Sequence, residues 1–333
     1  MSKEKSTKTG LYGLAAKIGG KLLAVLPKFM KGIKLLKFGL LALSLGSYAY
    51  LWTWKFAVLV VVAILEHEYS HILAMKQMGM KTKGVFMIPL LGAVAVSESS
   101  AKTYGQWAYV AIAGPIGGLA LTVAACVAYY ITGIPMIAGA AGFIAFINVF
   151  NLFPISMLDG NQVLRSIAFS INKNLGFIFM IVSLLITMVF MFKFHAGLFA
   201  FLIIVGGVDL VIEFYRRKNM KNQRDFYLKT ADEEEKWITT NYYNDFKDDP
   251  GMVNEYKGFA TFKGYCDHKG SKARKKYTKK ANDIMTAGPT PMNTKQIAYA
   301  IAAYALTTLA LIVIIRLMAH VPGADLAATF LAS

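Results

Sequence analysis

The sequence is poor in cysteine and in charged residues. It contains two cysteines, Cys126 in an apolar segment and Cys266 in a polar one. They are not expected to pair and have no metal-binding spacing, so neither a disulfide framework nor a cysteine zinc site is implied. Charged residues make up only 17% of the chain, whereas hydrophobic residues make up 56%. This balance excludes an ordinary soluble protein and indicates an integral membrane protein.

Acidic residues are scarce beside basic ones. The chain has 36 lysines and arginines against 19 aspartates and glutamates, a formal net charge of +17. Because the basic residues gather at the ends of apolar runs and in one polar stretch, membrane topology explains them better than a nucleic-acid partner does. Their positions predict a multi-pass membrane protein with the N-terminus and residues 215–295 in the cytoplasm. We expect the membrane to be a prokaryotic cytoplasmic membrane.

A secretory signal is missing as well. The basic N-terminal segment 1–36 has no convincing cleavage site, so we expect it to be retained. Several of its lysines fall on one side of a helical wheel. The segment is either an amphipathic helix on the anionic inner leaflet or a basic flank that orients the first span.

Long apolar runs, in contrast, are abundant. A helix needs roughly 20 apolar residues to cross a membrane, and the predicted spans are 37–54, 56–76, 105–131, 135–153, 175–192, 195–214 and 297–318. The apolar stretch 84–97 is too short to cross and contains Pro89 and Gly92. It predicts a hairpin or re-entrant loop buried against the bundle. The predicted fold class is an all-α polytopic membrane protein whose last span lies within 296–333.

The polar region 215–295 separates the last span from the others. Thr230 to Glu233 have the form of a helix start. Beyond Gly264, the lysine, glycine and serine content predicts a flexible linker. The aromatic residues between these points are expected to form a small core: Trp237, Tyr242, Tyr243 and Phe246.

Histidine is rare, and two of the five histidines belong to one motif. The sequence HEYSH at residues 67–71 lies inside the predicted span 56–76. On a helix, His67 and His71 share one face, so both imidazoles can bind a single tetrahedral ion, with Glu68 placed to act on water beside it. Roughly 0.002 chance matches to H-E-x-x-H are expected from this composition. The alternative is a hydrogen-bonded histidine pair packed in the bundle.

A hydrolytic zinc site uses three protein ligands and keeps an open position for water. The remaining histidines are poorly placed to be the third ligand. Asp159 has the most informative surroundings among the acids, because Pro154 ends or kinks the preceding span and Gly160 permits a backbone turn that aims Asp159 into the bundle. The acids near the predicted membrane core are Glu66, Glu98, Asp159, Asp209 and Glu213.

Two motifs together resemble one known family. HEYSH in the second span and NLFPISMLDG, from Asn151 to Gly160 after the fourth, are similar to the motifs of the site-2 protease family of intramembrane metalloproteases. The resemblance covers residues 37–214 and implies that family's six-span metalloprotease core. The last span is then an addition to the core.

The resemblance also implies the roles of the motif residues. His67, His71 and Asp159 are implied as the ligands of one zinc ion per chain, and Glu68 as the catalytic acid and base. Asn151 is implied to position the substrate or to stabilise its oxyanion. The implied substrate is a single-span membrane protein, cleaved within or near its transmembrane segment in regulated intramembrane proteolysis.

Two weaker features resemble the same family. Gly114, Pro115, Gly117 and Gly118 are similar to the glycine-proline motif of its third span, although the spacing by itself indicates close helix packing. The stretch 84–97 is similar to its membrane-embedded β-hairpin. This hairpin either binds an unwound substrate by adding a strand or fills space.

Glu66 departs from the family, which usually has an apolar residue there. On a helix, the Glu66 side chain points about 100° away from that of His67. This favours a structural or pKa-tuning role over ligation. Glu66 is expected to support the centre, to pair with a lysine or to face a water-filled channel. Asp209 and Glu213 are expected to form salt bridges with Arg216 and Arg217 at a helix end.

Two other functions compete with proteolysis within the membrane. One is a zinc-binding membrane transporter or scaffold, against which Glu68 argues because a purely structural site needs no base. The other is a membrane metalloprotease whose third ligand is a glutamate, against which the L-D-G setting of Asp159 argues.

Overall fold

The computed structural model describes residues 33–51, 53–88, 92–98, 101–194, 198–249, 251–252, 255, 257–286 and 288–322. The described chain divides into two compact units. The first comprises the described residues up to Ile167 and from Met292 onward, and the second comprises Ala168–Pro291. The predictions for residues 1–32 and for the Pro89 turn lie outside the described residues.

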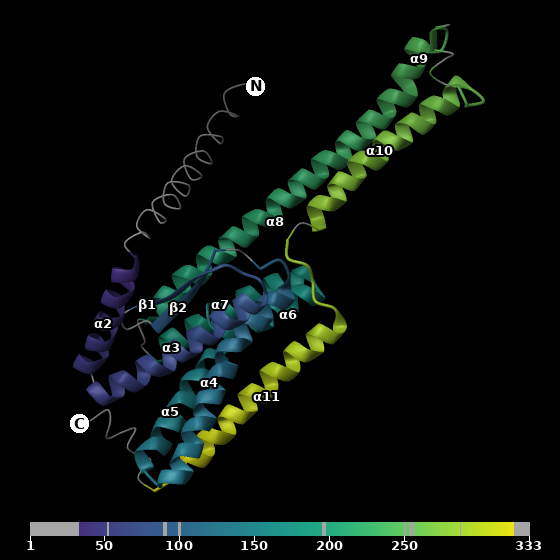
Figure 1. The fold of residues 1–333 in the computed structure, drawn as a ribbon. Helices are drawn as coiled ribbons and strands as arrows, with labels where there is room; N and C mark the ends of the chain where they lie inside the picture. The colour runs from purple at the N-terminus through teal and green to yellow at the C-terminus, as the bar shows by residue number, and fades with distance from the viewer. Residues whose placement is uncertain are drawn as a thin grey trace. The chain divides into compact units, whose positions relative to one another are not determined.

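The first unit contains six helices and one hairpin, all labelled in Figure 1. In chain order they are α2 (Ile33–Leu51), α3 (Trp54–Gln77), β1 (Thr82–Ile88), β2 (Gly92–Ser97), α4 (Tyr104–Thr132), α5 (Pro135–Asn151), α6 (Asp159–Ile171, whose last turn belongs to the second unit) and α11 (Thr294–Ala319).

Local sequence explains where the central helices begin and end. Thr53 and Thr103 cap α3 and α4, each accepting a hydrogen bond from a backbone N–H of the first turn. α4 ends at Gly133, whose left-handed φ of 66° suits a residue without a side chain. α5 starts with Pro135 in its first turn, where a missing N–H costs nothing.

The hairpin predicted at 84–97 is present as β1 paired antiparallel with β2. Val85 lies opposite Ala95 and Met87 opposite Ala93, and the register shifts between Thr82 and Gly84. β2 packs along α3, so the hairpin lies beside the helix that carries HEYSH.

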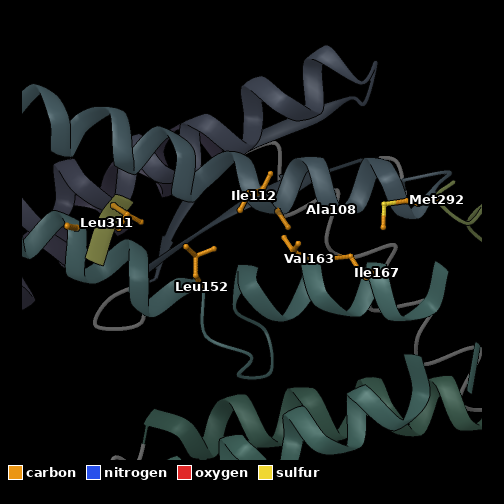
Figure 2. Close-up of a cluster of buried hydrophobic side chains, with 9 residues drawn as sticks. Ala108, Ile112, Leu152, Val163, Ile167, Met292 and Leu311 are labelled. Carbon is orange, nitrogen blue, oxygen red and sulfur yellow. The ribbon is translucent and has the colours of Figure 1, made fainter. Parts of the chain in front are cut away.

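A hydrophobic cluster joins α4, α6, α11 and the residue after α5 (Figure 2). It contains Ala108 and Ile112 of α4, Leu152 after α5, and Val163 of α6. α11 contributes Leu311, which is fully buried, and packs against both α4 and α5. The C-terminal helix is therefore built into the first unit.

The second unit contains α7 (Lys173–Phe194), α8 (Leu198–Lys236), the π-helix η2 (Trp237–Tyr242), α9 (Tyr243–Phe246) and α10 (Phe262–Thr286). Figure 1 shows α8 and α10 as a long helical hairpin. Its seam includes Cys266 and Ala281, both fully buried, and Arg274 of α10 forms ion pairs with Asp232 and Glu235 of α8.

This hairpin contradicts two predictions about the polar region. The helix start predicted at Thr230–Glu233 is wrong, because these residues lie within α8. The flexible linker predicted beyond Gly264 is also wrong, because α10 continues to Thr286. Composition alone favoured a linker, whereas the packing of small side chains against α8 stabilises a helix there.

Four helices of the described chain are long and apolar enough to cross a membrane: α3, α4, α7 and α11. α5 is apolar but shorter. The chain is thus a mostly helical membrane protein with a small sheet. The count of six core spans plus one stays a prediction, since it also needs α2, α5 and the first part of α8 to cross.

Candidate metal centre

Three side chains that the sequence places far apart meet in the first unit. His67 and His71 of α3 are 3% and 6% exposed, and their Nε2 atoms lie 3.2 Å apart. Asp159 is the first residue of α6, and its Oδ2 lies 2.8 Å from Nε2 of His67 and 3.4 Å from Nε2 of His71. The three residues form a cluster that could hold a metal ion.

These distances fit a tetrahedral zinc ion. Ligand bonds of about 2.0–2.1 Å at tetrahedral angles separate the ligand atoms by roughly 3.3 Å, close to the 2.8, 3.2 and 3.4 Å found here. Two imidazole nitrogens and one carboxylate oxygen also match the donor set of catalytic zinc sites, in which a fourth position stays open. The residues present therefore fit the metal.

Both imidazoles are oriented by partners on other helices. Nδ1 of His67 lies 2.8 Å from Oδ1 of Asn148, whose amide nitrogen donates to the carbonyl of Ile144. Because that bond fixes the orientation of the amide, Oδ1 accepts a hydrogen bond from the Nδ1–H of His67. Nδ1 of His71 donates to the carbonyl of Val110 at 2.7 Å. Each Nε2 lone pair is thus left free for a metal ion.

Sequence reasoning missed these two orienting groups. Asn148 is fully buried on the otherwise apolar α5, three residues before Asn151, and a polar residue in such a helix is a usable signal. The carbonyl of Val110 carries no signal in the sequence, because any residue offers one.

Glu68 is held beside the centre by the hairpin. Its Oε2 accepts the N–H of Ala95 in β2 at 2.7 Å. Glu68, His71 and Asp159 line a cavity of about 350 Å³, together with side chains of β2 and α4. The Glu68 carboxylate, two of the candidate metal ligands and a cavity therefore adjoin one another.

Asn151 is the last residue of α5 and lies beside the same cluster. Its Nδ2 is 3.5 Å from Nε2 of His67. Its amide is close enough to contact a substrate bound at the centre. The role of Asn151 in positioning the substrate or stabilising its oxyanion stays a prediction.

The glycines of α4 let this helix approach α3 and α5 closely. A Cβ added to Gly114 would lie against the Nε2 atoms of both His67 and His71, and one added to Gly118 would overlap the amide of Asn148. The close packing predicted from their spacing is therefore present, and it occurs at the centre itself.

Glu66 points away from the centre toward another glycine of α4. Its Oε1 accepts the hydroxyl of Ser70 at 2.9 Å, and its Oε2 is buried without a hydrogen-bond partner among the described residues. Gly117 leaves room for both side chains. Glu66 does not belong to the described cluster that could hold a metal ion, and its role stays a prediction. Glu213 pairs with Arg216 and Arg217 in the second unit, as expected.

The turn before Asp159 differs from the prediction. Gly160 lies within α6 and has no positive φ, whereas Met157 adopts φ of 75°. Gly160 is needed for space, because a Cβ there would overlap the carbonyl of Leu152. The turn assigned to Gly160 is therefore made two residues before Asp159.

Part of the chain is similar in sequence to known proteins. Residues 55–143 match the model of peptidase family M50. The chain is 34% identical over 125 residues to a provisionally named zinc metalloprotease of Synechocystis sp., covering 35% of this chain and 32% of that protein. It is 28% identical over 144 residues to a zinc metalloprotease of Methanocaldococcus jannaschii, covering 42% of this chain and 40% of that protein.

The matched parts thus span about a third and two fifths of these relatives' lengths. The family match at 55–143 includes HEYSH and the glycines of α4, whereas Asp159 lies beyond it. Over residues 55–143 the chain is therefore similar to peptidase family M50, the site-2 protease family, and parts of it are similar to these two zinc metalloproteases.

Proposed function

We propose that this chain is an intramembrane zinc metalloendopeptidase that hydrolyses a peptide bond within or near a transmembrane segment of a membrane-tethered substrate. The observation that carries the proposal is the cluster of His67, His71 and Asp159 with Glu68 beside it. The two histidines and Glu68 belong to α3, which is long and apolar enough to cross a membrane. A membrane-embedded centre restricts the substrate to peptides that reach it there.

A zinc ion bound by these three ligands supplies Lewis-acid chemistry, acidifying water and polarising a carbonyl. Glu68 accepts the proton of the attacking water and passes it to the leaving amine nitrogen. The N–H of Ala95 holds its carboxylate at the cavity. The amide of Asn151 is the donor available to the substrate carbonyl.

The substrate must be extended where it is cut, because a helix hides its carbonyls in hydrogen bonds. β2 lines the cavity next to Glu68, and a strand edge can bind an extended peptide. We therefore expect helix-breaking residues near the scissile bond to favour cleavage. A membrane-tethered regulator cleaved in regulated proteolysis would suit such a site, with the N-terminus and residues 215–295 in the cytoplasm.

The test measures zinc content and cleavage of a single-span model substrate with purified protein in detergent. Glu68→Gln is expected to bind zinc and lose cleavage by at least about 100-fold, since it removes the general base. Asp159→Ala is expected to lose both zinc and cleavage. Glu98→Gln, which neutralises an exposed carboxylate, is the matched control and should behave as wild type.

Retained cleavage in Glu68→Gln, or unchanged zinc content in Asp159→Ala, would contradict the proposal. A wild-type protein that binds zinc and cleaves no substrate would favour the alternative, a zinc-binding transporter or scaffold.

A further inference from the structure

The C-terminal helix α11 lies outside the family match at 55–143 and outside the six-span core. It nevertheless packs against α4 and α5 in the hydrophobic cluster of Figure 2. One of its side chains reaches the loop before Asp159: the hydroxyl of Tyr304, which is half-buried, donates to the carbonyl of Leu152 at 2.5 Å.

The Leu152 carbonyl needs such a donor. Leu152 is the C-cap that follows α5 and is 2% exposed, and the last carbonyls at a helix end have no partner within the helix. An unpaired carbonyl in an apolar bundle is costly, so the hydroxyl of Tyr304 stabilises this end of α5.

The same carbonyl is contacted by the residue next to a metal ligand. A Cβ on Gly160 would overlap both the oxygen and the carbon of the Leu152 carbonyl. The backbone of α6 therefore packs against the Leu152 carbonyl at Gly160, which is the residue directly after Asp159. The carbonyl is held by α11 through a hydrogen bond and supports the first turn of α6 by contact.

We propose that Tyr304 is a positioning residue for Asp159 and acts through the Leu152 carbonyl. The helix α11 thereby helps to set the geometry of the metal centre in this chain. The inference rests on the proposed function for the identity of the metal. It differs from simple packing, because packing requires the ring of Tyr304 and positioning requires its hydroxyl.

Tyr304→Phe keeps the ring and removes the hydroxyl. We expect the full-length variant in detergent to bind Co²⁺ on the order of tenfold more weakly than wild type, the lower end of the range for groups that orient metal ligands. The visible absorption of bound Co²⁺ should change because the carboxylate shifts. With zinc, kcat should fall by a similar factor at unchanged KM. Tyr299→Phe, on the same helix but 74% exposed, is the matched control.

Gly160→Ala would place a methyl group against the same carbonyl. It should change the Co²⁺ spectrum in the same direction as Tyr304→Phe does. The inference is overturned if Tyr304→Phe binds Co²⁺ with wild-type affinity and spectrum, or if it only lowers the melting temperature. A wild-type protein that binds no Co²⁺ would instead overturn the proposed metal centre, so the two failures are distinguishable.

Discussion

Gly114 of α4 lies against the two histidines. A Cβ at this position would contact the Nε2 atoms of His67 and His71, which are the candidate metal-binding atoms. The imidazoles cannot move away freely, because Asn148 and Val110 hold their Nδ1 atoms. The absence of a side chain at Gly114 is therefore part of the site.

Gly114→Ala is accordingly expected to weaken zinc binding by at least about tenfold while the protein stays folded, since displaced ligands lose affinity before the bundle loses its core. A chelator competition titration measures this. Gly142→Ala is the matched control, because its Cβ would meet only Met318 at an ordinary 3.6 Å. Equal zinc affinity in both variants would show that the ligand geometry tolerates the extra carbon.

Among the elements, the hairpin of α8 and α10 departs most from the sequence-based prediction. Its seam is narrow and depends on small buried side chains such as Ala231, Cys266 and Ala281. The outer face of α10 is rich in lysine, and this composition led to the prediction of a linker. Helix formation here depends on the partner helix more than on local sequence.

Labelling of Cys266 tests this element. Burial raises the pKa of its thiol above the ordinary value, so the reactive thiolate is scarcer at a given pH, and the closed seam also blocks the reagent. In a Cys126→Ser background, maleimide should label Cys266 at least about tenfold more slowly than a cysteine introduced by Lys272→Cys on the exposed face. Equal labelling rates at pH 8 would mean that α10 is not packed against α8.

For the whole molecule, the metal centre joins helices that are distant in the chain. His67 and His71 come from α3 and Asp159 from α6, while α4 and α5 supply the orienting groups. A metal ion bound only by the folded state stabilises that state by mass action, by about 4 kcal/mol when its free concentration is about 1,000 times Kd. Zinc should therefore stabilise the entire first unit.

Removal of zinc with a chelator is expected to lower the melting temperature of wild-type protein in detergent by several degrees, and added zinc should restore it. The same treatment should hardly change the melting temperature of Asp159→Ala, which lacks one ligand. A wild-type melting temperature that does not depend on zinc would indicate that the ion does not link these helices.

Local patterns account for what was predictable from the sequence. Apolar runs, threonine caps and glycine ends mark α3 and α4 to within a few residues, and the i, i+4 spacing places His67 and His71 on one face, because helical geometry depends on neighbouring residues. Asp159 was recognised from its surroundings and its motif, although the turn that presents it is at Met157.

Sequence patterns alone were therefore enough to predict a membrane protein, the hairpin, the resemblance to the site-2 protease family and the candidate ligands. Only the tertiary structure decided what holds them: Asn148 is 81 residues from His67, and Tyr304 is 152 residues from Leu152. Such pairs meet because whole helices pack, which no local pattern records. The pairing of α8 with α10 was hidden for the same reason.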